Sequence, residues 1–450
     1  MRIKPLLTCA FMLVVTWLFA YHTVRHEFWQ VWLVFTSLFL GYFTLIWSNF
    51  KLSLRQGIGL AIVLRLIFLP STPVLSDDVY RFLWDGLLML DGMSPYAFLP
   101  SQISVDSISG IDSALFAAMN SPDYYSVYPP VSQWIFAGSG WISGGDLDVF
   151  LIALRTLFIG SELLIFYILY RLLKFRKVST YPVLFYALNP LVIIEGVGNL
   201  HFEVIMICFA LSALYLFLKN RLLIGVVCLA LSISIKLVSL ILWPFMIPVL
   251  GWRKWIMGSV VLVGLLLLLF YPLWEANYLL NYTESIRLYF KTFEFNASIY
   301  YIFRALGIWM KGYNLIAIIG PLLSVLSIIG LAIFLIKTMR RTCVDFVVSC
   351  FVFGFIWYLL CSTTVHPWYL LLPLAFACLT RQRSLIIWSA VIWLSYHAYS
   401  FNPVTEMALI VALEYVVLVY ALYCERHLLS CHTSEGCADT ASSYRNVDHC

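Results

Sequence analysis

The residues best placed to do chemistry stand in the segment 76–86, SDDVYRFLWDG, which follows directly on an apolar run. Two neighbouring carboxylates, Asp77 and Asp78, would lie at the edge of a membrane, where ionisable groups are costly unless they have a role. A carboxylate in such a place can act as a general base that takes a proton from an attacking hydroxyl group. This segment is therefore the first candidate for a catalytic site.

The same segment also has a purely structural interpretation. On a helix, Asp78, Arg81 and Asp85 share one face, and apolar residues occupy another, so one face would meet solvent and the other lipid. Ser76 or Asp77 would cap the helix, and Arg81 and Asp85 would form an i,i+4 ion pair. The sequence leaves both interpretations open.

A second cluster of polar residues lies in NPLVIIEGVGNLHFEV, at 189–204. It brings Glu195, Asn199, His201 and Glu203 to a predicted outer turn between two membrane crossings. Charged groups so close to the hydrocarbon layer usually mark a site or a pathway. The alternative is that Asn199 and His201 cap a tight helical hairpin, which the nearby glycines allow.

Two isolated basic side chains are candidates for binding an anion. The run 222–250 is too long for one crossing, and we expect it to be split at Lys236. The ammonium group of Lys236 would then reach the outer surface. There it would lie beside a phosphate or snorkel to the lipid headgroups. His366 is predicted in an outer loop, where it would donate to a phosphate oxygen, act as an acid or base, or serve only structure. Arg304 belongs to the outer loop 274–311, whose mixed charge is typical of a solvated face.

The rest of the chain predicts the scaffold that must position these groups. Of the 450 residues, 62% are apolar and only 11% are charged, against roughly 25% charged residues in a soluble domain. Repeated apolar runs match a hydrocarbon layer of about 30 Å, and the alternation typical of a membrane β-barrel is absent. We therefore expect an all-α, polytopic membrane bundle of about 12 to 14 crossings.

The crossings and their orientation follow from the apolar runs and the basic loops. Candidate crossings cover residues 6–21, 29–48, 57–70, 149–173, 181–198, 202–218, 222–235, 237–250, 255–273, 312–337, 344–361, 368–380, 384–400 and 405–423. With a cytoplasmic N-terminus, most basic residues fall in inner loops, as the positive-inside rule requires. Both termini are then cytoplasmic, and the candidate site faces outward from a plasma membrane or cell inner membrane.

This orientation requires that the apolar run 130–143 does not cross the membrane. It is predicted as a juxtamembrane helix that begins after Pro129 and Pro130, since proline is tolerated in the first turn of a helix. The large first loop, 71–148, then lies outside the cytoplasm and carries nine of the 23 acidic residues. The predicted domains are a transmembrane hairpin at 1–56, a catalytic transmembrane domain at 57–423 and a disordered cytoplasmic tail at 424–450.

The order of these motifs along the chain carries a resemblance. SDDVYRFLWDG is followed by MLDGMSPY at 89–96, SVYPPVSQWIF at 126–136, NPLVIIEGVGNLH, the isolated Lys236, the FNASIYYIFR loop and VHPWYLL. In this order they resemble the polyprenyl-phosphate-mannose-dependent mannosyltransferases of the glycosyltransferase C superfamily, over roughly residues 57–400. Three crossings precede the large loop where many relatives have one, so the first two look like an added hairpin.

The resemblance implies a glycosyltransferase that moves a hexose, mannose in its relatives, from a polyprenyl-phosphate-linked donor to a glycan or lipid-linked acceptor. It implies that Asp77 or Asp78 is the catalytic base and that one displacement inverts the anomeric carbon. Lys236, His366 and Arg304 would stabilise the departing phosphate. The other candidate substrate-binding residues are Tyr80, Arg81, Trp84, Asp85, Tyr128, Glu195, Asn199 and His201. Among these, the carboxylate Glu195 and the amide Asn199 would orient sugar hydroxyls, and the aromatic residues would stack on the ring or shape the cleft.

The remaining expectations concern partners and competing functions. No cofactor or metal is expected, the partners are the lipid-linked sugar, the acceptor and membrane lipid, no nucleic acid is involved, and the sequence does not set the oligomeric state. A flippase or transporter of lipid-linked oligosaccharides would place charges at several depths, whereas only Arg65, Arg155 and Glu162 are plainly mid-membrane here. A glycan polymerase or ligase is also compatible with the sequence.

Overall fold

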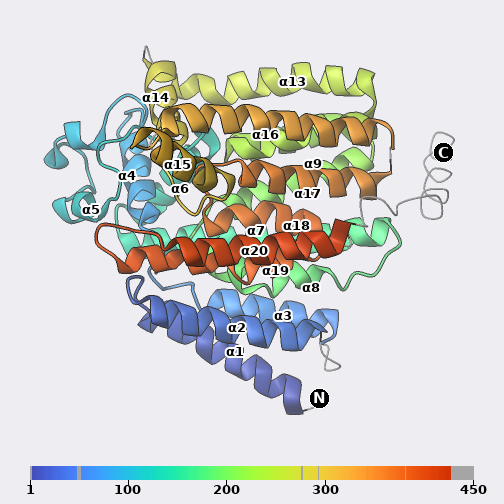
Figure 1. The fold of residues 1–450 in the computed structure, drawn as a ribbon. Coiled ribbons are helices and arrows are strands. Elements are labelled where there is room, and N and C mark those ends of the chain that lie inside the picture. The colour runs from blue at the N-terminus through green and yellow to red at the C-terminus, as the bar shows by residue number, and fades with distance from the viewer. Residues whose placement is uncertain are drawn as a thin grey trace.

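The structure is a computed structural model that describes residues 3–47, 52–274, 277–291, 293–341, 343–380 and 382–426. Within these ranges the chain is built from helices, and an isolated β-bridge joins Phe295 to Thr364 (Figure 1). The predicted all-α class is confirmed. Most of the predicted tail, 427–450, lies outside the described residues.

The helices follow one another closely along the chain. In the first half they are α1 (Ile3–His22), α2 (Phe28–Trp47), α3 (Leu54–Leu66), α4 (Asp78–Leu90), η1 (Pro100–Gln102), η2 (Val105–Ser107), α5 (Ser113–Ala118), α6 (Pro130–Ser143), α7 (Leu147–Phe175), α8 (Val183–Ala187), η3 (Val192–Gly198), α9 (Glu203–Leu218) and α10 (Leu222–Ile233). In the second half they are η4 (Leu237–Ile241), α11 (Leu242–Phe245), α12 (Ile247–Leu250), α13 (Trp252–Phe270), η5 (Tyr271–Leu273), α14 (Tyr278–Lys291), α15 (Ile299–Lys311), α16 (Ile316–Met339), α17 (Val344–Leu360), η6 (Pro367–Leu370), α18 (Leu371–Ala377), α19 (Ser384–Ser389), η7 (Ile392–Ser400) and α20 (Ala408–Glu425).

Several of these helices are suited to a membrane. Six of the described helices, α1, α2, α7, α13, α16 and α20, are long and apolar enough to cross one, and a seventh crossing results if η3 and α9, which meet at 107°, form one bent span. Large apolar side chains on α13 and α16, such as Val260 and Leu322, are exposed, as expected for helices that face lipid. The chain is therefore a polytopic helical membrane protein, while the count of about 12 to 14 crossings stays a prediction.

Some predicted crossings are interrupted because their sequences contain helix breakers. The run 181–198 is divided into α8 and η3 near Pro190, and the run 237–250 is divided into η4, α11 and α12, with Pro244 and Pro248 inside it. Proline lacks the N–H group that a continuous helix needs. The predicted break at Lys236 is confirmed, since this residue separates α10 from η4.

The long helices lie side by side, and the short helices of the first loop gather at one end of them. Figure 1 shows α1, α2 and α3 as a group along one side of the bundle, and α4, α5, α6, α14 and α15 together at the end opposite the start of α1 and the end of α20. α2 packs on η7, and α3 packs on α7, α8 and η3, so the N-terminal group is joined to the rest along its length. The predicted helix at 130–143 is confirmed as α6.

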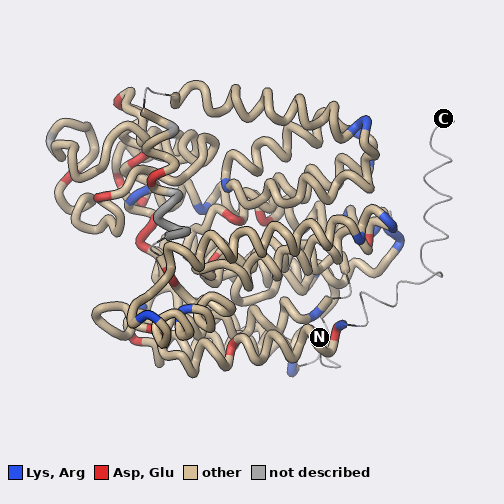
Figure 2. Tube along the Cα trace, turned by 45° about the horizontal axis from the view of Figure 1, so that its top comes forward, with Lys and Arg blue, Asp and Glu red and all other residues tan. Residues whose placement is uncertain are grey.

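Charge is distributed unevenly between the two ends of the bundle. Figure 2 shows Lys and Arg gathered at the end where α1 begins and α20 ends, and most Asp and Glu at the end that carries α4 and α5. This asymmetry is what the positive-inside rule predicts for a cytoplasmic N-terminus. The acidic end is the one that holds the candidate catalytic residues.

The charged groups in the middle of the bundle are satisfied by structural contacts. Arg65 and Glu162 are fully buried and form an ion pair of 2.7 Å. The Tyr186 hydroxyl also donates to Glu162 at 2.9 Å. Because a buried ion pair needs further hydrogen bonds to offset its desolvation, these contacts explain how the pair is tolerated without a functional role.

Arg155 fixes the two chain segments that lead into the candidate site. Its guanidinium donates to the carbonyl groups of Leu69 (3.3 Å), Val197 (3.2 Å) and Gly198 (3.0 Å), and also to that of Ser71. One pair of carbonyls follows α3 and the other closes η3. Arg155 thus acts as a buried clamp between the segment before Asp77 and the turn before α9.

Candidate active site

The two candidate catalytic carboxylates stand at the start of α4, partly exposed. Asp77 occupies the position before the helix, but its side chain makes no cap and instead forms an ion pair of 2.7 Å with Arg25, from the α1–α2 connection. Asp78 begins the helix and accepts a hydrogen bond of 3.1 Å from Asn120. The Asp77 side chain is 37% exposed, so solvent and ligands can reach it.

The second half of the same motif is buried and structural. Arg81 and Asp85 form an ion pair of 2.7 Å. Asp85 also accepts from Ser126 (2.6 Å) and Gln133 (3.1 Å). The Arg81 guanidinium donates to two carbonyl groups in the loop above, at residues 121 and 124. The prediction that this face of the helix meets solvent is therefore wrong for Arg81 and Asp85, because the chain that follows α5 covers them.

The aromatic residues of the motif serve different purposes. Trp84 is fully buried and packs against Phe116, so it holds the loop onto α4 and faces no substrate. Tyr128 packs edge-on against Phe82 at 5.0 Å. Tyr80 is half-buried next to Asp77, and burial together with that negative charge raises the pKa of its hydroxyl. Of the aromatic candidates in this loop, Tyr80 lies nearest the exposed carboxylates.

The second predicted cluster forms a connected network at the sharp turn between η3 and α9. Glu195 is fully buried and accepts from Asn199 (3.1 Å) and Tyr396 (2.7 Å). Its Oε2 lies 3.2 Å from Nε2 of His201, an ion-pair distance without hydrogen-bond alignment. These groups bind one another, so Glu195 supports the turn and has no free face for a sugar hydroxyl.

Asn199 links this turn to the acid pair. Its side-chain oxygen accepts from the amides of Val74 (3.2 Å) and Leu75 (3.0 Å), in the segment that runs into Asp77. The next residue, Leu200, has a φ of +59°, a left-handed conformation that is rare for a bulky side chain and tends to occur at functional sites. Asn199 is thus a positioning residue for the acids.

His201 and His366 face each other across one indole ring. Trp368 is stacked between them, with ring centroids 3.8 Å from His201 and 4.3 Å from His366. Burial, reinforced by the proximity of His201 and Lys236, lowers the pKa of His366 to about 3. His366 is therefore neutral at physiological pH, and its buried Nδ1 has no partner in the structure. It can offer one N–H group to a ligand but no positive charge.

Lys236 lies beside this stack and supplies a charge. Its ammonium group forms an ion pair with Glu203 and lies 5.4 Å from the ring centroid of Tyr369. The Lys236 side chain is 33% exposed, and the second carboxylate oxygen of Glu203 is buried without a partner. The predicted residues Lys236, His201 and His366 are thus brought together by α9, η4 and η6.

Arg304 belongs to a different cluster. Its guanidinium lies 3.2 Å from Glu294 and 5.6 Å from the ring centroid of Tyr301. Tyr301 in turn donates to Glu406, which also accepts from the backbone amide of Asn296 at 2.7 Å. These contacts hold α15 against the segment before α20 and thus stabilise the fold.

Three residues at the site were not predicted from the sequence. Arg25 pairs with Asp77 and lies 5.0 Å from the ring centroid of Tyr399, and Tyr396 binds Glu195. Arg25 carried a usable signal, because it is a basic residue outside the inner loops. The two tyrosines lie in an apolar run, where nothing in the pattern distinguished them.

The described residues contain no group of three or more His, Cys, Asp or Glu side chains arranged to hold a metal ion. The neighbouring acids Asp77 and Asp78 do not form such a group, and the first of them already has the Arg25 guanidinium as its counter-ion. A divalent cation at that carboxylate would have to displace this partner.

Comparison with known proteins places these features in a family. The model of the alpha-(1->6)-mannopyranosyltransferase N-terminal domain matches residues 5–252. The chain is 26% identical to alpha-(1->6)-mannopyranosyltransferase A of Corynebacterium glutamicum over 188 residues, 42% of this chain and 37% of that protein. It is 27% identical to the protein of the same name from Mycobacterium tuberculosis over 181 residues, 39% of this chain and 33% of the relative.

The matches cover only part of this chain and of its relatives. The matched segments span only about a third of the length of the curated relatives. The family match starts at residue 5, so it includes the first two helices, which the sequence had suggested were an added hairpin. It contains the acid motif, the η3–α9 turn and Lys236, whereas Arg304 and His366 lie beyond it. Because the match covers more than half of the 450 residues, the chain belongs to the alpha-(1->6)-mannopyranosyltransferase family.

Proposed function

We propose that this protein is an integral membrane mannosyltransferase. It transfers mannose from a polyprenyl-phosphate-linked donor to a glycan or lipid-linked acceptor, at the end of the bundle that carries α4, on the outer face of the membrane. The observation that carries the proposal is the pair of partly exposed carboxylates, Asp77 and Asp78, in a chain of this family.

The chemistry needs one carboxylate in contact with the acceptor. The acceptor hydroxyl gives its proton to Asp77 or Asp78 as its oxygen forms a bond to the anomeric carbon of the donor. The bond between that carbon and the phosphate oxygen breaks, and the polyprenyl phosphate leaves with the electron pair. A single displacement inverts the anomeric carbon, so a β-linked donor gives an α-glycoside.

The leaving phosphate needs fixed donors and positive charge. Lys236 is the best candidate because its ammonium group is partly exposed beside the stacked histidines. Neutral His366 adds a hydrogen-bond donor rather than a second charge. Arg304 is paired with Glu294 in another cluster, so we assign it to structure and not to the phosphate.

A flippase or transporter explains the structure less well. Such a protein is expected to carry ionisable groups at several depths along its path. Here Arg65 and Glu162 satisfy each other, and Arg155 is engaged by backbone carbonyl groups. The described mid-bundle charges are thus accounted for by the fold, and the partly exposed candidate acids, Asp77 and Asp78, lie at the end that carries α4.

The experiment is a transfer assay with purified protein, synthetic polyprenyl-phosphate mannose and an α-(1->6)-linked dimannoside as acceptor. We expect Asp77→Asn or Asp78→Asn, whichever removes the base, to lower the rate by ~10²–10⁴. Asp91→Asn, an exposed acid at the far end of α4, is the matched control and should keep the wild-type rate. Full activity of both acid variants, or no transfer by the wild type, would refute the proposal.

A further inference from the structure

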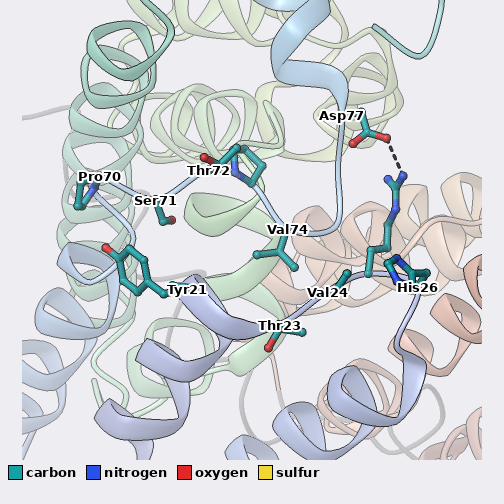
Figure 3. Close-up of a pocket in the computed structure, with 12 residues that line it drawn as sticks. Tyr21, Thr23, Val24, His26, Pro70, Ser71, Thr72, Val74 and Asp77 are labelled. Atoms are coloured by element: carbon teal, nitrogen blue, oxygen red, sulfur yellow. Dashed lines mark hydrogen bonds and ion pairs between the residues drawn. The ribbon is translucent and has the colours of Figure 1, made fainter. Parts of the chain in front are cut away.

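A cavity of about 530 Å³ lies between the α1–α2 connection and the segment that leads into α4 (Figure 3). Its volume falls within the range of roughly 300–1,000 Å³ that is typical of small-molecule sites. The lining residues come from two short stretches, 20–26 and 70–77, and include Tyr21, Thr23, Arg25, His26, Thr72 and Asp77. Figure 3 shows Asp77 and its ion-pair partner at one end and Tyr21 with Pro70 at the other.

Both walls of this cavity are held in place by hydrogen bonds to neighbouring elements. The Tyr21 hydroxyl donates to the carbonyl of Ile67 at 2.8 Å, which fastens the end of α1 to the end of α3. On the other wall, the Ser71 carbonyl is bound by the buried Arg155. The cavity is therefore part of the fold, and a ligand would enter a preformed site.

The lining favours a neutral ligand rich in hydroxyl groups. Thr23 and Thr72 offer hydroxyls, His26 an imidazole, and the Arg25–Asp77 pair a donor and an acceptor of opposite charge. The carboxylate would repel a phosphate group. A prenyl chain would strip water from these polar atoms without replacing its hydrogen bonds, which costs free energy.

The ion pair at the end of the cavity can admit a ligand group. The side chains of Arg25 and Asp77 are 30% and 37% exposed, and a pair that solvent reaches in this way contributes little to stability. An incoming hydroxyl can therefore share or replace one contact at little cost. Among the residues that line the cavity, Asp77 is the sole carboxylate.

We propose that this cavity is the acceptor site, where a saccharide binds with one hydroxyl directed at the Asp77 carboxylate. The inference rests on the proposed function and deepens it: the α1–α2 hairpin becomes part of the active site, and Asp77, rather than Asp78, takes the proton. Arg25 is then a positioning residue that orients the carboxylate. The phosphate of the donor binds on the other side, near Lys236 and His366.

The test fills the cavity without touching the acids. Thr72→Trp places a large ring on one wall, and Glu27→Trp, in the same connection as Arg25 but outside the cavity, is the matched control. We expect Thr72→Trp to raise the KM for the α-(1->6)-linked dimannoside about tenfold or more, with the KM for the donor unchanged. Glu27→Trp should leave both constants at the wild-type values.

A binding measurement separates this inference from the proposed function. Ligand-observed NMR with the dimannoside needs no turnover. We expect a binding signal of the dimannoside with the wild type and with Glu27→Trp, and none with Thr72→Trp. If Thr72→Trp fails to fold, Val24→Trp fills the same cavity from the opposite wall. If the wild type transfers mannose and both cavity-filling variants keep the wild-type KM for the acceptor, the acceptor-site inference is wrong while the proposed function stands. The same holds if these variants raise the KM for the donor and not that for the acceptor. A wild type without transfer would overturn the function.

Discussion

The two ends of the motif 76–86 place carboxylates in opposite surroundings. At the C-terminal side, Asp85 is fully buried and receives hydrogen bonds from Arg81, Ser126 and Gln133. At the N-terminal side, the Asp77 side chain is more than a third exposed and forms an ion pair with Arg25. A buried carboxylate that accepts three hydrogen bonds stabilises the fold, whereas a partly exposed one beside a cavity is available to a substrate.

The comparison also explains why a single short motif contains both. The Arg81–Asp85 pair fixes the loop between α5 and α6 over the helix. That loop carries Asn120, which binds Asp78. The buried Arg81–Asp85 pair therefore holds in place the loop that binds Asp78, the neighbour of Asp77.

The largest effect that separates the two ends is on stability. Asp85→Asn removes the charge that compensates the buried Arg81 guanidinium, so we expect a loss of about 3–5 kcal/mol in the free energy of unfolding. Asp77→Asn breaks a partly exposed pair and should cost at most about 1 kcal/mol. Thermal unfolding of the two purified variants in the same detergent measures the difference.

Equal unfolding midpoints for these two variants would contradict the structural role of Asp85. An activity assay separates the two carboxylates further, because Asp77→Asn should be folded and inactive. Asp85→Asn should lose activity only in proportion to its unfolded fraction, so lowering the temperature should restore transfer to Asp85→Asn but not to Asp77→Asn.

A smaller effect is expected at the glycine that ends the motif. A Cβ atom on Gly86 would lie 2.5 Å from the Phe136 carbonyl oxygen, where α4 crosses α6. Gly86→Ala must therefore push the helices apart, which typically costs about 1–3 kcal/mol. Gly138→Ala on α6, where nothing lies within 4 Å of the added atom, should be neutral or stabilising, since alanine favours helix by up to about 1 kcal/mol. A Gly86→Ala protein as stable as Gly138→Ala would contradict the close crossing.

The sequence predicted most of the scaffold because the apolar runs and basic loops obey simple rules. The class, the break at Lys236 and the helix at 130–143 all follow from hydropathy, charge and proline positions. The number of crossings could not be fixed, since prolines and the turn at Leu200 divide apolar runs that a hydropathy pattern joins.

The candidate site was predicted less completely, for a different physical reason. Helical spacing identified Arg81 and Asp85 as a pair but could not show that a distant loop buries them. Likewise, Arg25 is 52 residues from Asp77 along the chain, and Trp368 lies between two histidines from separate segments. Such contacts depend on tertiary packing, which a local pattern does not contain.

His366 gives the smallest and most specific test of the buried side of the site. Its pKa is about 3 in the folded protein, against about 6.5 in an unfolded chain. As the pH falls below about 6.5, the unfolded chain takes up a proton that the folded protein refuses, so stability decreases from pH 6.5 down toward pH 3, by at most about 1.4 kcal/mol per pH unit. In His366→Gln the unfolding midpoint should change less with pH between 6.5 and 3 than in the wild type. In His22→Gln, at the exposed end of α1, it should change with pH as in the wild type. If the unfolding midpoint depends on pH in the same way in wild type, His366→Gln and His22→Gln, His366 takes up a proton as easily as an exposed histidine. His366 would then be an accessible group, like Asp77.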